Sequence, residues 1–196
     1  MKVTPVAKGR LEYALIEDFY TAEELELVNA ELAELVAHAQ DPAVAGAAFD
    51  DAGYLKTGTG LFINNHYHHG LEHSSILTIG RKLFSPQVLD AVNPLSVGWE
   101  HIYRSNVDYT MVNFYASQQE YRAHRDRSVF TALIFLGMGT FEGGAFELTD
   151  FDELIPFRPN TGIIIPGCVT HRAQAITCEP GNYRVSIANF IGYRQD

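Results

Sequence analysis

The run Val129-Phe-Thr-Ala-Leu-Ile-Phe-Leu136 has the length of a β-strand and the β-branched and aromatic residues that strands favour. Similar runs recur through the second half of the chain, and glycine or proline stands between them. They are Val107–Tyr115, Ala145–Leu148, Gly162–Ile165, His171–Thr177 and Arg184–Ile191. Many short strands separated by turns predict an antiparallel β-sandwich or barrel, with its core at roughly residues 101–196.

The first half of the chain has helical patterns instead. Thr21-Ala-Glu-Glu24 is a capping box, and apolar residues recur at helical spacing from Leu25 to Val36. A second helix is predicted over Ser74–Phe84, and Ser85-Pro86 starts a third after a short strand at Leu61-Phe-Ile63. Roughly residues 1–100 are therefore predicted to be a helical support packed on one side of the barrel, within one domain of residues 1–196.

The composition is that of a folded globular protein. Hydrophobic residues make up 46% of the 196 residues and charged residues 19%, and the length suits one domain. Acidic residues outnumber basic ones by 24 to 14, which gives a formal net charge of −10. Nucleic acid is therefore not an expected partner, because phosphate binding depends on a surplus of lysine and arginine.

Cysteine content and hydropathy indicate the compartment. Cys168 and Cys178 are too few for a disulfide framework, and Met1–Val6 lacks the pattern of a signal segment. The longest apolar run, around Gly162–Pro166, is far shorter than the ~20 residues of a membrane helix. We expect a cytoplasmic protein with no membrane partner and with free, packed cysteines, while the oligomeric state stays open.

His124-Arg-Asp126 is the first motif that indicates chemistry. Residues i and i+2 of a strand point to one face, so His124 and Asp126 can present a nitrogen and an oxygen to one point. His171, at the start of a later β run, is the natural third ligand. Two histidines and one carboxylate suit a non-haem Fe(II) oxygenase, whereas a surface ion pair among arginines is the alternative reading of the first two residues.

Arg184-Val-Ser186 lies inside an apolar β run. Arg184 and Ser186 share one strand face and can offer a guanidinium and a hydroxyl to a carboxylate. Burial of an unpaired arginine is costly, so an anionic partner is expected. That partner is either an internal aspartate or glutamate, or a bound ligand.

Taken together, His124-x-Asp126, His171 and Arg184-x-Ser186 resemble the Fe(II)/2-oxoglutarate-dependent oxygenases, and within them the prolyl-4-hydroxylase-like branch. Four longer segments are similar to that branch in the same order, and they cover most of the chain. They are Ile16–Leu25, Tyr115–Asp126, Thr131–Phe146 and Arg158–Arg172. One departure is the turn after Tyr115, which has no glycine here.

The resemblance implies a mostly β fold with supporting helices, the double-stranded β-helix or cupin-like jelly roll. It implies that His124, Asp126 and His171 are the metal ligands and the catalytic residues. The expected cofactors are Fe(II), 2-oxoglutarate as cosubstrate and O2, with ascorbate as a candidate reductant.

The same resemblance assigns the cosubstrate site. Arg184 is implied to bind the far carboxylate of 2-oxoglutarate, with Ser186 and Tyr115 as further contacts. Phe135 stands where some relatives have a tyrosine that reaches this carboxylate, so that contact is missing here.

The implied reaction is hydroxylation of an unactivated C–H bond, with release of succinate and carbon dioxide. The substrate is a small metabolite or a short peptide segment with a side chain such as proline, recognised by loops at about residues 52–70 and 97–110. Two other functions stay open: a zinc-dependent hydrolase that uses the same triad, and a non-catalytic jelly-roll sensor of a metal or a dicarboxylate.

Several other features are weaker signals. His66, His68 and His69 read as a solvated or substrate-side loop more readily than as a second metal site. Lys56–Phe62 is similar to the relatives' segment beside the substrate mouth, and an ordinary loop is its alternative reading. Four arginines form either a positive funnel toward the site or ordinary exposed strand positions: Arg122, Arg125, Arg127 and Arg172. Three aromatic residues are expected in the core: Trp99, Tyr103 and Tyr109.

Overall fold

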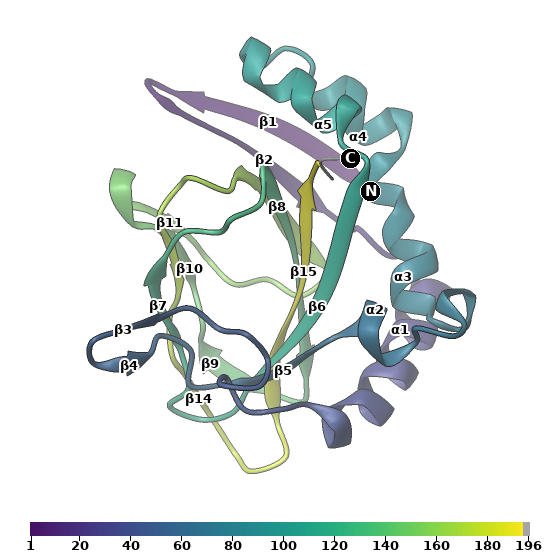
Figure 1. Ribbon diagram of the computed structural model, residues 1–196, viewed down its shortest axis with the longest axis vertical. Coiled ribbons are helices and arrows are strands. Elements are labelled where there is room, and N and C mark those ends of the chain that lie inside the picture. Colours follow the sequence, from purple (N-terminus) through teal and green to yellow (C-terminus); the bar gives the residue numbers. More distant parts are fainter. Residues whose placement is uncertain (194–196) are drawn as a thin grey trace.

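Two β-sheets that face each other form the centre of the protein (Figure 1). The computed structural model describes residues 1–193. The major sheet has the strand order β1-β2-β12-β8-β15-β6-β5, and the minor sheet has the order β11-β10-β13-β7. The major strands are β1 Lys2–Lys8, β2 Leu11–Glu17, β5 Thr59–Phe62, β6 Val107–Tyr115, β8 Phe130–Met138, β12 Thr161–Pro166 and β15 Tyr183–Gly192. The minor strands are β7 Tyr121–His124, β10 Phe146–Leu148, β11 Glu153–Ile155 and β13 His171–Ala173.

Two short ribbons lie beside these sheets. One pairs β3 Phe49–Asp50 with β4 Gly53–Tyr54, and the other pairs β9 Phe141–Gly143 with β14 Ile176–Cys178. In Figure 1 the segment with β3 and β4 crosses in front of the space between the two sheets.

The helices cover one face of the major sheet (Figure 1). They are α1 Ala22–Leu35, α2 Ile63–His66, α3 Ser75–Gly80, α4 Pro86–Val92 and α5 Glu100–Arg104. Turns of 3-10 helix lie at Val36–His38, Leu71–His73, Arg81–Phe84, Val97–Trp99 and Thr149–Phe151. The capping box is confirmed, because Thr21 and Glu24 satisfy each other's backbone amides at the start of α1.

The central strands of the major sheet are buried on both faces. Ile134 on β8 packs with the helices, while its neighbour Phe135 packs with Phe146 of the minor sheet, with ring centroids 5.7 Å apart. This explains why apolar residues stand on both faces of β8 and β15, since one face packs against the helices and the other faces the minor sheet. The predicted fold class, a mostly β jelly roll with helices packed on one side, is confirmed.

The sequence interpretation missed part of the major sheet. The hairpin of β1 and β2 extends it by two strands, so residues 1–100 are not only a helical support. Pro5 argues against a strand, but β1 is an edge strand, where proline is tolerated. Two other boundaries differ: the predicted helix Ser74–Phe84 is α3 followed by a 3-10 turn, and the predicted strand His171–Thr177 divides into β13 and β14.

No helix in residues 1–193 has both the length and the apolar character that crossing a membrane requires.

Candidate metal and cosubstrate site

The three predicted metal ligands meet at one end of the minor sheet. His124 ends β7 and lies directly opposite His171, the first residue of β13, while Asp126 lies in the loop just after β7. Asp126 Oδ1 is 3.8 Å from His124 Nε2, and Asp126 Oδ2 is 3.5 Å from His171 Nε2. Ligands about 2 Å from one ion are about 3–3.5 Å from each other, so the three side chains are close to a coordinating arrangement.

Both imidazole rings are oriented by the backbone. The Nδ1 of His124 lies 2.8 Å from the carbonyl oxygen of Arg122, and the Nδ1 of His171 lies 2.9 Å from that of Val169. In each ring Nδ1–H therefore donates, which leaves the lone pair of Nε2 free toward Asp126. Such a contact on the far nitrogen fixes the tautomer that binds a metal.

Electrostatics also favour a metal at this place. Burial, together with the neighbouring imidazole of His171, lowers the pKa of His124 to about 4. The ring of Tyr121 stacks on that of His124, with centroids 3.6 Å apart. His124 is therefore neutral at physiological pH, as metal ligation requires. The donor set of two imidazoles and one carboxylate fits Fe(II), and within residues 1–193 it is the sole cluster of this kind.

Asp126 is positioned by Thr131 at the start of β8. Thr131 Oγ1 donates to Asp126 Oδ2 at 2.5 Å, and the backbone N–H of Asp126 donates to the carbonyl oxygen of Gly167. Arg125 points elsewhere and pairs with Asp150 and Thr170. The carboxylate is thus held toward the two histidines without a cationic partner of its own.

Replacement of Thr131 by valine is expected to weaken Fe(II) binding by about 10–100-fold, because loss of an outer hydrogen bond frees the ligating carboxylate. Anaerobic metal titration measures this. T110V is the matched control, since Thr110 Oγ1 also donates within the major sheet, to Asn189, but on the buried side away from the triad. Equal metal affinities of the two variants would contradict the role of Thr131.

Arg184 lies on β15, opposite Tyr115 of β6, and its side chain is 1% exposed. Its Nε and Nη1 have no hydrogen-bond partner among the described residues. The guanidinium instead lies among the rings of Tyr115, Phe135 and Phe157, at 5.1 to 5.9 Å from their centroids. Gly144 makes room for it, because a Cβ there would come within 2.8 Å of Arg184 Cδ.

An unpaired buried guanidinium is costly, so this pocket could accept an anion that the described residues do not supply. The internal aspartate or glutamate considered as a partner from the sequence is absent among residues 1–193. Ser186 lines the same cavity, and burial raises the pKa of Tyr115, so its hydroxyl stays protonated and can donate. Phe135 is buried in the wall beside the guanidinium.

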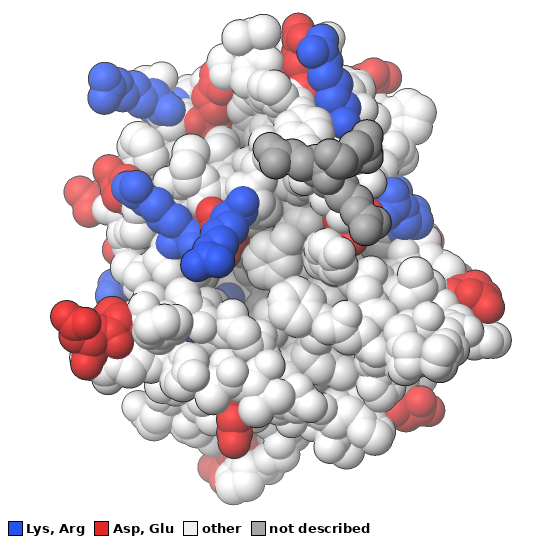
Figure 2. All heavy atoms as spheres, in the orientation of Figure 1, with Lys and Arg blue, Asp and Glu red and all other residues white. Residues whose placement is uncertain are grey.

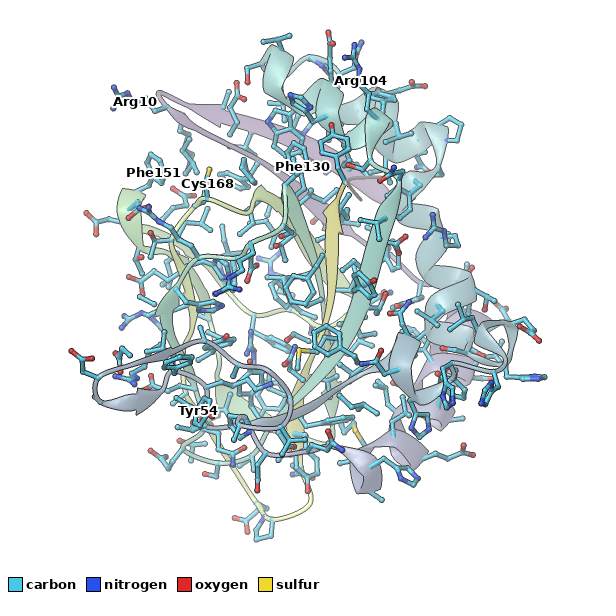
Figure 3. The ribbon with its side chains drawn as sticks, viewed as in Figure 1. Arg10, Tyr54, Arg104, Phe130, Phe151 and Cys168 are labelled. Atoms are coloured by element: carbon cyan, nitrogen blue, oxygen red, sulfur yellow. The ribbon has the colours of Figure 1, made fainter. Side chains whose placement is uncertain are left out.

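The triad and Arg184 line one cavity of about 1290 Å3 between the two sheets. Figure 2 shows this face hollowed near its centre, with basic side chains beside the hollow. The loop at residues 43–56 closes one side, and Tyr54, labelled in Figure 3, is one of its lining residues. Of the two loops predicted to surround the mouth, residues 52–70 contribute several side chains to the cavity lining. From residues 97–110 only Val107 and Tyr109 line it. The sequence interpretation missed residues 43–49, which also line the cavity.

The remaining sequence candidates lie elsewhere. His66, His68 and His69 are exposed around the end of α2, outside the cavity lining and outside the metal cluster. Cys168 and Cys178 are free, but Cys168 is exposed on a peripheral loop (Figure 3), so the prediction of a packed thiol is wrong for it.

Predictions for the core aromatic residues and the arginines had mixed outcomes. Trp99 is buried as predicted, whereas Tyr103 and Tyr109 are 44% and 50% exposed, because the first lies on the outer face of α5 and the second at the cavity mouth. Arg122, Arg125 and Arg172 each pair with a carboxylate. Arg125 and Arg127 line the cavity, so only part of the predicted funnel borders it.

By sequence the chain matches no family model and no curated protein. By structure it is similar to a prolyl-4-hydroxylase from Pseudomonas putida, with 13% identity, a TM-score of 0.66 and coverage of 95% of both chains. A prolyl hydroxylase from Trichoplax adhaerens, solved with a peptide of the hypoxia inducible factor oxygen degradation domain, has 12% identity, a TM-score of 0.64 and coverage of 92% and 83%.

A third similar structure is SnoN, a non-haem α-ketoglutarate-dependent epimerase from nogalamycin biosynthesis, with 13% identity, a TM-score of 0.59 and coverage of 95% and 80%. These proteins differ in what they act on but share one architecture. At this identity the likeness concerns the fold. The chain has the jelly-roll fold of the prolyl hydroxylases and other 2-oxoglutarate- and Fe(II)-dependent oxygenases.

Proposed function

We propose that this protein is an Fe(II)- and 2-oxoglutarate-dependent dioxygenase that hydroxylates a C–H bond of its substrate. One observation carries the proposal: the His124, Asp126 and His171 cluster and the unpaired guanidinium of Arg184 line the same cavity. A metal triad alone also suits a hydrolase, but a hydrolase would leave the buried arginine without a role. The fold of the structurally similar oxygenases supports the same class.

The residues of the chain have separate tasks in this function. His124, Asp126 and His171 hold the metal, while Arg184 binds the far carboxylate of 2-oxoglutarate by charge-assisted hydrogen bonds, with Ser186 beside it. When bound, iron and 2-oxoglutarate supply the oxidation of a C–H bond, with release of succinate and carbon dioxide.

The cavity wall orients these groups and keeps water away from them. Tyr115 and Phe135 enclose the guanidinium of Arg184, so its hydrogen bonds to a carboxylate form in a medium of low dielectric. Tyr121 covers one face of His124 and is itself held by the backbone N–H of Ala48, which donates to its hydroxyl. The wall thereby covers His124 on one side, so that a ligand can reach it only from the cavity side.

The proposed substrate is a small molecule or a short exposed peptide segment, which the cavity would receive between its own strands and loops. A cytoplasmic setting stays a prediction, consistent with two free cysteines.

Succinate release tests this function. Protein with Fe(II), 2-oxoglutarate and oxygen is expected to release succinate slowly even without a substrate, and anaerobic addition of Fe(II) and 2-oxoglutarate should produce a weak visible absorption band. Release should stop when Zn(II) replaces Fe(II). Hydrolysis supported by Zn(II) would favour the hydrolase instead, and binding of both ligands without any succinate would favour the sensor.

A further inference from the structure

Lys56 is a buried cation in the wall of the same cavity. It lies between β4 and β5, where its backbone pairs with Tyr121, and its side chain is 1% exposed. Its Nζ donates to Asn113 Oδ1 at 2.8 Å. Gly60 leaves space for the ammonium, because a Cβ at that position would lie 2.8 Å from Nζ. The residues that surround Lys56 therefore leave space for its ammonium group and give it one hydrogen-bond acceptor.

Lys56 differs from the other lysines of the chain in its partner. Lys2, Lys8 and Lys82 each pair with a glutamate at 3.0 Å or less. Lys56 has only a neutral amide oxygen, although it is the most buried of the four. Burial lowers its pKa to about 8, so the ammonium form still predominates at pH 7. An uncompensated buried charge of this kind is costly, and a ligand of opposite charge would offset that cost.

The charges in the cavity do not balance without a further anion. Lys56, Arg125, Arg127 and Arg184 line it, and Asp126 is the one carboxylate among the described lining residues. With a divalent metal and doubly charged 2-oxoglutarate added, Asp126 and the cosubstrate neutralise the metal and one buried cation. One buried positive charge is left over, apart from the two arginines at the exposed rim.

The cavity also has room for a second molecule. Its volume of about 1290 Å3 exceeds the roughly 300–1000 Å3 of common small-molecule sites. Tyr109, Phe190 and Tyr193 line the part toward the mouth and offer apolar contact, while Lys56 and Asn113 lie deeper. A ligand with an apolar body and one negatively charged end would match both parts.

We propose that Lys56 binds a carboxylate of the substrate, so that the protein acts on a small carboxylic acid. This inference rests on the proposed function, because the charge balance includes the metal and 2-oxoglutarate. Lys56 is then the residue that selects the substrate, and Asn113 holds its ammonium in place. A neutral substrate, such as an internal peptide segment, would leave the buried ammonium unpaired.

The test uses protein loaded with Mn(II) and saturated with 2-oxoglutarate, so that binding is measured without turnover. Aliphatic and aromatic carboxylic acids are titrated by calorimetry, each beside its primary amide. We expect acids to bind more tightly than their amides, and K56M to weaken acid binding at least about tenfold, as for loss of a buried charge pair. If no acid binds better than its amide, or if K56M binds the acids as wild type does, the proposal is wrong.

K82M is the matched control. Lys82 is partly buried and donates to Glu24 and to the carbonyl oxygen of Phe19 in the helical layer. K82M is expected to lower the thermal midpoint, because Glu24 loses its cationic partner, and to leave acid binding unchanged. K56M is expected to keep or raise the midpoint, because methionine removes a buried charge. A lysine that served only the fold would give the opposite pattern, and K56Q provides the same comparison if K56M does not fold.

Binding of 2-oxoglutarate separates the two levels of proposal. If K56M loses affinity for 2-oxoglutarate and not for the acids, Lys56 belongs to the cosubstrate and only this inference fails. If wild-type protein binds neither Mn(II) nor 2-oxoglutarate, the proposed function fails. Binding of acids that still depends on Lys56 would then show that its carboxylate site exists without that function.

Discussion

Replacement of Arg184 by leucine is expected to raise the dissociation constant for 2-oxoglutarate by about 100-fold or more, while metal content stays unchanged. The guanidinium is buried among aromatic rings with Nε and Nη1 unpaired, so a carboxylate that reaches it forms hydrogen bonds in a dry environment. Leucine removes the charge and both donors at once. Anaerobic calorimetry with Mn(II)-loaded protein measures the affinity directly.

The leucine variant should also fold at least as well as the wild type, since an unpaired buried charge is replaced by an apolar side chain. R172L is the matched control, because Arg172 lies on β13 beside His171 but pairs with Glu147 outside the cavity. It is expected to leave 2-oxoglutarate binding unchanged. If R184L lost metal and 2-oxoglutarate to the same extent, Arg184 would be structural.

The strand pattern and the triad could be predicted from sequence because their signals are local. The long strands β6, β8 and β15 lie in runs rich in apolar and β-branched residues, and His171 opens another predicted run, whereas the short strand β7 that carries His124 was found only through the His-x-Asp motif. The prediction that Asp126 shares a strand with His124 was less accurate, because β7 ends at His124. Hydrogen bonds to Thr131 and to the carbonyl oxygen of Gly167 hold Asp126 in place instead. The loop that carries Asp126 is held by contacts with segments distant in sequence, and such contacts produce no periodic pattern in the sequence.

The burial of Lys56 and the exposure of Tyr109 are what the sequence could not predict. Lys56 lies in a stretch rich in glycine that looks like a loop, and its burial follows from the pairing of β5 with β6 and from the bridge to Tyr121. Tyr109 is an ordinary strand aromatic by pattern, yet it lies half exposed at the cavity mouth. Both cases depend on tertiary packing, which overrides local propensity.

Removal of the Asp126 carboxylate, a proposed metal ligand, is expected to have the second large effect. D126A is expected to lower metal affinity by more than about 100-fold, because outer hydrogen bonds alone account for about 10–100-fold and this change removes a ligand itself. His124 and His171 would be left as two neutral donors without the charge that balances a divalent ion. Succinate release should fall to the level without protein at any practical Fe(II) concentration.

D150A is the matched control, since Asp150 accepts from the backbone of Thr170, next to His171, but lies outside the triad. It is expected to keep metal affinity within about threefold, as for a change outside the site. A D126A protein that held iron as tightly as D150A would show that the metal, if bound, is held by other residues.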